Sequence, residues 1–351
     1  MAWVGLYALS WFWSDNPEYW NTRLQVKLPI ILLPLAFAFT PAFSYRQLKI
    51  FTLVLIMLLL FAAGYSLYHF LLAPDVFIEA YNVSHVIPSI PKNDHIRSSL
   101  AIACGVVWLA YFAGRSREGW LKWLSIATII ILTFHLHLLA ARTGLMALYI
   151  FFLGWLLYKV SRLRSRLVGA LLLIAFLGSA VAATQLVPTL RERIDYVRYT
   201  IRVYNNEGLK GNYSDLGRIM SYDLAFRLIK SHPVTGVGAG HILDSMKGAY
   251  SNWYPHVAEE QRLIPHNQFL TVGVATGIPG LILFTLWVIY PIRHLKRNRT
   301  GFFFLMIWCM MLVPLSVEPV LEVQFGVFVY LFFLLWMRHA MLKPSEAQCT
   351  S

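Results

Sequence analysis

The chain has 351 residues, of which 58% are hydrophobic and 13% are charged, and its mean hydropathy is +0.58. Soluble domains carry about 25% charged residues, so this composition excludes an ordinary soluble domain as well as a disordered chain. Three cysteines are too few for a disulfide scaffold. The composition is that of a polytopic membrane protein, and the positions of the cations must explain the net charge of +13.

Nine apolar runs are long enough to cross a bilayer, which takes roughly 20 residues of helix. They cover residues 27–43, 50–73, 98–113, 121–140, 143–158, 167–187, 267–290, 301–317 and 323–341. A tenth apolar stretch, 1–13, spans about 20 Å as a helix and is interpreted as the end of a span or as an interfacial helix. It lacks the basic start and the cleavage site of a signal peptide. The predicted fold is therefore all-α, with nine or ten transmembrane helices.

Basic residues cluster between alternate spans, which predicts the orientation of the chain. The clustered side holds 15 Lys and Arg residues, opposed only by Glu118 and Glu346. By the positive-inside rule this side is cytoplasmic, and it includes the C-terminus. The remaining charges cancel on the opposite side, so the net charge reflects membrane orientation and predicts no nucleic-acid partner.

The longest connection, residues 188–265, lies on the outer side, and connections of this length usually carry function. Its first part, 188–204, has the spacing of an amphipathic helix, whose arginines contact either an anion (headgroup or ligand) or only solvent. A second helix is predicted from Ser214 or Asp215 to about residue 231. The predicted organisation is N-terminal transmembrane helices (1–187), this periplasmic segment (188–265), three C-terminal transmembrane helices (266–341) and a cytoplasmic tail (342–351).

A glycine-rich sequence runs from Gly236 to Gly240 and resembles a loop that binds phosphate. No predicted strand precedes it, however, and it lies outside the cytoplasm, where dinucleotides are scarce. Close backbone packing is therefore the preferred interpretation of these glycines.

Charged and titratable residues mark the outer ends of several predicted spans. His266 stands at a helix start, where the helix dipole opposes protonation of the ring, so it is either a neutral general base or a simple interfacial side chain. Arg142 lies in a very short turn between two apolar helices and is either a functional cation or an anchor for lipid phosphate. Arg23 and Lys27, four residues apart on one helix face, are likewise either anchors or phosphate contacts.

Several absences narrow the chemistry. The predicted spans hold no Asp or Glu, which argues against a proton- or sodium-coupled transporter. The sequence contains no Asp-x-Asp pair and no Cys/His cluster with metal-ligand spacing, and His135 and His137 point to different sides of a helix. We therefore expect neither a metal nor a cofactor, and arginines would have to neutralise any bound diphosphate.

Three segments, taken in order, resemble the bacterial O-antigen ligase/O-antigen polymerase family. They are Arg142-Thr-Gly-Leu, Arg218 followed by the stretch from Ala225 to Gly240, and His266-Asn-Gln-Phe-Leu. Each motif is short, but their order, spacing and shared position on the outer side make the set specific. The resemblance extends over nearly the whole chain.

The resemblance implies a metal-independent, inverting glycosyltransferase of the GT-C type in the bacterial inner membrane. Membrane lipids would be among its partners. It would transfer a glycan from undecaprenyl diphosphate to a hydroxyl group of lipid A–core oligosaccharide at a periplasmic active site. His266 would be the catalytic base, and Asn267 would orient the acceptor or His266. The residues that would bind the donor diphosphate are Arg142, Arg218, Arg23 and Lys27, of which Arg142 and Arg218 would also be catalytic.

Alternative functions remain open at this stage. An O-antigen polymerase or a protein O-oligosaccharyltransferase would use the same donor and the same residues with another acceptor. A non-catalytic transporter of anions or lipid-linked sugars would instead need cations through the depth of the membrane. The notable cations of this chain all lie at one predicted surface, which favours the transferase.

Overall fold

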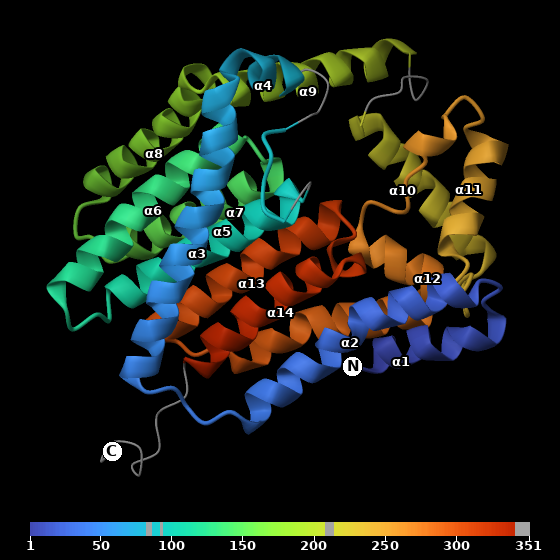
Figure 1. Ribbon diagram of the computed structural model, residues 1–351, viewed down its shortest axis with the longest axis horizontal. Helices are drawn as coiled ribbons and strands as arrows, with labels where there is room; N and C mark the ends of the chain where they lie inside the picture. The colour runs from blue at the N-terminus through green and yellow to red at the C-terminus, as the bar shows by residue number, and fades with distance from the viewer. Residues whose placement is uncertain (82–85, 92–93, 208–213, 341–351) are drawn as a thin grey trace. The chain divides into compact units, whose positions relative to one another are not determined.

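The computed structural model (Figure 1) describes residues 1–81, 86–91, 94–207 and 214–340. The described residues are largely helical, and no strand occurs among them. In chain order the helices are α1 (Ala2–Leu9), η1 (Ser10–Trp13), α2 (Pro17–Phe39), α3 (Tyr45–Leu72), α4 (Pro74–Ala80), α5 (His95–Ala113), α6 (Gly119–Leu139), α7 (Arg142–Val160), α8 (Arg166–Leu186), α9 (Pro188–Glu207), α10 (Ser214–Ser231), α11 (Ile242–Trp253), η4 (Glu259–Gln261), α12 (Gln268–Ile289), η5 (Tyr290–His294), α13 (Arg299–Val317), η6 (Val320–Glu322) and α14 (Gln324–His339).

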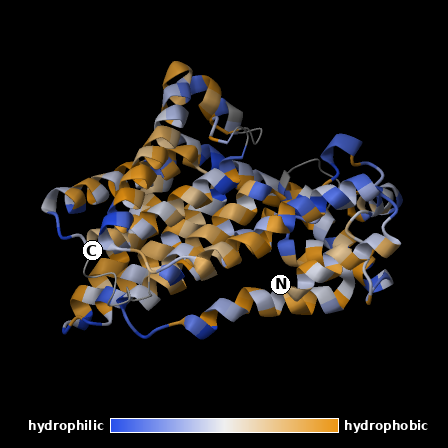
Figure 2. Ribbon diagram, turned by 60° about the horizontal axis from the view of Figure 1, so that its bottom comes forward, coloured by the Kyte–Doolittle hydropathy of each residue, from blue (hydrophilic) through white to orange (hydrophobic). Residues whose placement is uncertain are grey.

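The prediction of an all-α polytopic membrane protein is confirmed. Within the described residues, eight helices are long and apolar enough to cross a membrane, namely α2, α3, α5, α6, α7, α8, α12 continued by η5, and α13. Figure 2 shows hydrophobic residues along these helices and many of the hydrophilic residues in the connections and at helix ends. The ninth predicted span corresponds to α14, which has 16 helical residues. The stretch 1–13 forms α1 and η1.

The chain divides into two compact units. The first unit contains Met1–Phe39, Val197–His294 and Leu312–Phe332, and the second contains Thr40–Tyr196, Leu295–Met311 and Phe333–Ser351. In the first unit, α12 packs against α1 and α10, and in the second unit α5 packs against α6 and α7. The division predicted in sequence order stays a prediction, and its tail at 342–351 lies outside the described residues.

Both helices predicted in the long connection are present as α9 and α10. Helix α10 ends just before His232 and Pro233, because proline cannot donate the backbone hydrogen bond that a helix interior requires. Residues 208–213, part of the predicted turn between the two helices, lie outside the described residues. The contact of α9 with anionic headgroups or an anionic ligand stays a prediction.

The glycine-rich loop after α10 packs against a break in α12. Gly277 interrupts α12 with a φ of 69°, a left-handed conformation that glycine adopts without steric cost. The backbone amides of Val237 and Gly238 donate hydrogen bonds to the carbonyl oxygens of Val274 and Ala275, at 2.8 and 3.0 Å. Close backbone packing is therefore confirmed as the role of this loop, because these amides are committed to protein carbonyls and do not form a phosphate cradle.

Candidate active site

Three charged or titratable side chains meet within the first unit. Arg218 lies near the start of α10, His266 lies two residues before α12, and Glu318 directly follows α13. The guanidinium of Arg218 donates a hydrogen bond to Glu318 and forms an ion pair with it. The Nε2 atom of His266 lies 3.8 Å from the other carboxylate oxygen of Glu318. The carboxylate thus joins two of the three predicted catalytic residues.

The hydrogen bonding of His266 assigns the tautomer of its ring. Its Nδ1 atom lies 3.0 Å from the carbonyl oxygen of Ile264. A carbonyl oxygen only accepts hydrogen bonds, so Nδ1 carries the hydrogen and donates it. In the neutral ring, Nε2 then bears the lone pair that can take up a proton. The neighbouring carboxylate of Glu318 favours the positively charged ring that results.

Exposure separates the three members of this cluster. The side chains of Arg218 and His266 are 24% and 19% exposed, whereas that of Glu318 is 4% exposed. A ligand can therefore reach the cation and the imidazole while the carboxylate stays behind them. Because phosphate oxygens accept the same forked hydrogen bonds as a carboxylate, the partly exposed guanidinium can also bind a phosphate group.

Helix α10 fixes the backbone of His266 through side chains that follow Arg218 by one turn. The hydroxyl of Tyr222 donates a hydrogen bond to the carbonyl oxygen of His266 at 2.9 Å, and Ser221 Oγ accepts one from its backbone amide at 3.2 Å. Burial raises the pKa of Tyr222, although Arg218 opposes this, so the hydroxyl remains a donor. Residues three and four apart share one helix face, which explains how one helix supports both the cation and the imidazole.

Asn267 caps α12 and holds the segment that carries His266. Its Oδ1 atom accepts hydrogen bonds from the backbone amides of Phe269 and Leu270, at 2.9 and 3.2 Å. Its Nδ2 atom donates to the carbonyl oxygen of Ser316 at 2.8 Å. These bonds are those of a strong N-cap residue. A contact of Asn267 with the acceptor stays a prediction.

Two glutamates were not selected as site residues by the sequence analysis. Glu318 and Glu322 stand four residues apart in a short connection between α13 and α14, and each binds a cation from a distant part of the chain. A signal for them does exist in the sequence. They form an isolated pair of carboxylates between two apolar runs, next to the membrane, where an uncompensated charge is costly.

Arg142 lies in the second unit, at the first position of α7. The turn before it contains Ala140, which has a φ of 45°. Only two residues separate α6 from α7, so the very short turn is confirmed, although Arg142 already belongs to α7. The last carbonyl groups of α6 are satisfied by side chains, since Tyr81 and Thr189 donate hydrogen bonds to the carbonyl oxygens of Leu139 and Leu138 at 2.6 and 2.7 Å. Burial raises the pKa of Tyr81 and keeps its hydroxyl a donor. Hydrogen bonds thus hold the turn that precedes Arg142. That Arg142 lies near the Glu318 cluster stays a prediction.

Arg23 and Lys27, the two other predicted diphosphate contacts, both bind the connection that contains Glu322. The ammonium group of Lys27 is 2.8 Å from the Glu322 carboxylate, and the Lys27 side chain is 0% exposed. Arg23 donates to the backbone carbonyl oxygen of Glu322 at 3.0 Å and keeps 18% of its side chain exposed. A direct phosphate contact is therefore easier for Arg23, because Lys27 would first have to leave its carboxylate.

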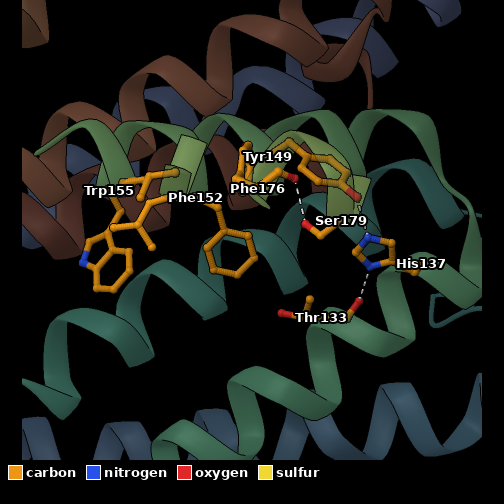
Figure 3. A pocket seen from close by; sticks show the side chains of 9 residues that line it. Thr133, His137, Tyr149, Phe152, Trp155, Phe176 and Ser179 are labelled. Carbon is orange, nitrogen blue, oxygen red and sulfur yellow. Dashed lines mark hydrogen bonds between the residues drawn. The ribbon is translucent and has the colours of Figure 1, made fainter. Parts of the chain in front are cut away.

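Figure 3 shows a groove in the second unit, formed by residues of α6, α7 and α8, with a volume of about 420 Å³. His137, Thr133 and Ser179 lie at one end, and Trp155 lies at the other. The Nδ1 atom of His137 donates to the carbonyl oxygen of Thr133 at 2.8 Å, so its Nε2 atom accepts from the hydroxyl of Tyr149, also at 2.8 Å. The groove is mostly apolar and suits a hydrocarbon chain.

These features define a class of protein. The chain is a polytopic α-helical membrane protein in which a histidine, an arginine and a shared carboxylate meet at the end of a membrane helix. Within the described residues, no group of three or more His, Cys, Asp or Glu side chains could hold a metal ion.

Residues 127–285 match the family model described as O-Antigen ligase. This segment contains Arg142, Arg218 and His266. The match confirms the resemblance drawn from the sequence motifs over this segment and supports membership of the O-antigen ligase/polymerase family. Glu318, Arg23 and Lys27 lie outside the matched segment. No curated protein matches the chain.

Proposed function

We propose that the protein is an O-antigen ligase-type glycosyltransferase that moves a glycan from undecaprenyl diphosphate to lipid A–core oligosaccharide. The observation that carries this proposal is the cluster of Arg218, Glu318 and His266, two of whose members lie in the segment that matches the family model. A transferase that acts on a lipid diphosphate needs a base for the acceptor and a cation for the leaving group. This cluster offers both within one unit of the chain.

In the proposed reaction, the oxygen of an acceptor hydroxyl forms a bond to the anomeric carbon of the donor sugar. The bond from that carbon to the diphosphate oxygen breaks, and its electron pair leaves with the diphosphate. The hydroxyl proton passes to Nε2 of His266, and Glu318 stabilises the imidazolium. Attack from the side opposite the leaving group inverts the anomeric centre. Acid–base assistance of this kind contributes about 10² to 10⁴ in rate.

Arginines supply the charge that stabilises the leaving group in this proposal. The planar guanidinium groups of Arg218 and Arg142 can each bind phosphate through two hydrogen bonds. Arg23, with part of its side chain exposed, adds a further cation, and Lys27 contributes through the electrostatic field of its ion pair. Preorganised cations in a site with little water stabilise a developing anion by several kcal/mol, so the reaction needs no metal ion.

The distribution of basic residues supports a periplasmic active site in a multi-pass protein of the bacterial inner membrane, with the C-terminus in the cytoplasm. His266 and Glu318 lie next to the ends of α12 and α13 that the charge pattern assigns to the periplasm. The apolar lining of the groove of α6, α7 and α8 is suited to hold a chain of the lipid carrier.

Purified protein in lipid nanodiscs, supplied with undecaprenyl-diphosphate glycan and lipid A–core acceptor, tests the proposal directly. We expect glycosylated lipid A–core from the wild type and about 10² to 10⁴ less from His266→Ala. His256→Ala, which changes an exposed histidine of the same unit, is the matched control and should be fully active. Activity should persist in EDTA. Unchanged turnover by His266→Ala would remove the proposed base.

The choice of acceptor distinguishes the ligase from its relatives with the same donor. Lipid A–core, a second donor glycan or an acceptor peptide can each be offered to the same preparation. Product on lipid A–core alone supports the ligase. Longer lipid-linked glycan would identify a polymerase, and glycopeptide would identify a protein O-oligosaccharyltransferase.

A further inference from the structure

Three consecutive residues, the two before α12 and its first residue, contact one short segment, residues 316–322, which runs from the end of α13 through η6 and which we call the carboxylate turn. His266 approaches Glu318, and Asn267 donates to the backbone carbonyl oxygen of Ser316. The third residue, Gln268, is completely buried and also binds this turn. The proposed base and the carboxylate turn are therefore attached to each other at several successive points.

Gln268 uses both ends of its side-chain amide in this contact. Its Oε1 atom accepts a hydrogen bond from the backbone amide of Leu321 at 2.7 Å, and its Nε2 atom donates to the carboxylate of Glu322 at 2.9 Å. An amide bonded at both ends has only one useful orientation. Gln268 thus fixes the distance between the start of α12 and the far end of the carboxylate turn.

Lys27 holds the same end of the turn from α2. Its ammonium group donates to the Glu322 carboxylate at 2.8 Å and to the backbone carbonyl oxygen of Leu321 at 3.3 Å. Buried ion pairs contribute little net stability, because desolvation offsets much of the Coulomb attraction, and their best-attested use is to select one arrangement among several. A completely buried Lys27–Glu322 pair therefore points to fixed geometry as its purpose.

The geometry that this network fixes is that of Glu318. This carboxylate lies four residues before Glu322 in the same turn and must meet both Arg218 and His266. A shift of about 1 Å in such an arrangement can reduce a rate by 10².

We propose that Gln268, Lys27 and Glu322 are positioning residues that hold Glu318 against His266 and Arg218. This inference rests on the proposed function for its kinetic consequences but not for its structural ones. It assigns Lys27 a role in the reaction that requires no contact with the diphosphate. It also explains why a lysine and a glutamate remain buried beside a membrane helix.

Gln268→Met tests the proposal, because methionine keeps the length of the side chain and removes both hydrogen bonds. We expect kcat for glycan transfer to fall by about 10- to 100-fold, with the KM values of donor and acceptor within about twofold. The matched control is Gln324→Met, which changes the exposed glutamine at the start of α14. Its kcat should equal that of the wild type. Wild-type kcat in Gln268→Met would overturn the proposal.

A double substitution separates positioning from a general loss of structure. If Gln268 acts through Glu318, then Gln268→Met should have little further effect on kcat in a Glu318→Gln background. Losses that multiply would overturn the proposal. Lys27→Met combined with Glu322→Met replaces the ion pair by apolar side chains and should fold well. It should lower kcat as Gln268→Met does, and an unchanged kcat would count against the proposal.

Hydrogen exchange provides a readout that does not depend on activity. The backbone amide of Leu321 donates to Gln268, so its exchange should accelerate at least about tenfold in Gln268→Met as the protecting bond is lost. Exchange at Leu321 should be unchanged in Gln324→Met. Unchanged exchange in Gln268→Met would refute the network even if transfer activity were absent, whereas an inactive wild type with accelerated exchange would refute only the proposed function.

Discussion

Glu318 and Glu322 lie four residues apart in the same connection and are both almost completely buried, at 4% and 3% exposure. Their partners differ. Glu318 binds Arg218, which is 24% exposed, and approaches the partly exposed His266. Glu322 binds Lys27, whose side chain is 0% exposed, at 2.8 Å, and the partly exposed Arg23 lies farther from the carboxylate, at 3.7 Å. The two carboxylates are equally buried, so the exposure of the cation distinguishes the two pairs. We call Arg218–Glu318 the open pair, because a ligand can reach its cation, and Lys27–Glu322 the closed pair, because a ligand cannot.

This difference has an energetic basis. A partly exposed arginine can leave its carboxylate and remain hydrated. Exchanging the carboxylate for a phosphate as the partner of the arginine therefore costs little free energy. A completely buried ammonium group has no such choice, because separating it from its carboxylate leaves an uncompensated charge in a medium of low dielectric constant. The first pair is therefore suited to binding a ligand, and the second to holding the fold in place.

The largest expected effect is on stability and concerns the closed pair. Lys27→Met removes the buried cation of Glu322 and leaves only the Arg23 guanidinium, 3.7 Å from the carboxylate, so it should lower the free energy of unfolding by up to about 3–5 kcal/mol. Arg218→Ala should lower it by less, because water can enter the space left by the partly exposed arginine and hydrate the Glu318 carboxylate. Denaturant titration of both variants in detergent, monitored by tryptophan fluorescence, measures this contrast. Equal losses of stability would remove the distinction drawn here between the two carboxylates.

The next effect is on activity and concerns the open pair. We expect Arg218→Ala to lower transfer activity at least about tenfold, which equals about 1.4 kcal/mol, while expression and membrane insertion stay normal. Arg142→Ala should behave in the same way if its guanidinium also binds the diphosphate. Lysine should restore each activity only in part, because a point charge cannot form two parallel hydrogen bonds. Steady-state assays with varied donor concentration provide the measurement, and full activity of Arg142→Lys would contradict the bidentate contact.

The smallest expected effect is on the pH dependence of stability. Burial would raise the pKa of Glu322, but the ammonium of Lys27 and hydrogen bonds from Lys27 and Gln268 outweigh it and lower this pKa. A carboxyl with a depressed pKa stabilises the fold above its unfolded value, about 4.3, and this contribution is lost as the pH falls through the folded value. Acid titration of unfolding should therefore be shallower below about pH 4.3 in Glu322→Gln than in the wild type. Parallel curves would show that the pair contributes nothing to acid sensitivity.

Much of the architecture was readable from the sequence because hydropathy and helix signals act locally. The apolar runs, the amphipathic helix α9 and the very short turn between α6 and α7 all depend on residues that are close in the chain. His266 was singled out in the same way, through its position at a helix start, whereas Arg218 was selected through the resemblance of its segment to the family.

The ion pairs could not be read in this way. Arg218 and Glu318 are 100 residues apart, and Lys27 and Glu322 are 295 apart. No periodicity connects such partners, and only the folded chain brings them together. For the same reason the sequence left open whether Lys27 is a lipid anchor or a phosphate contact, whereas the fold gives it a carboxylate partner.

The break in α12 at Gly277 has a practical consequence for study of the extramembrane part. The carbonyl groups that the break releases are paired with amides of the loop after α10, so this loop completes the hydrogen bonding of a membrane helix. A water-soluble fragment cut from residues 188–265 would expose the loop amides and lose the packing surface beneath them. Crystallography or antibody generation on such a fragment would sample a different fold, and experiments on this protein need the whole chain in a lipid or detergent environment.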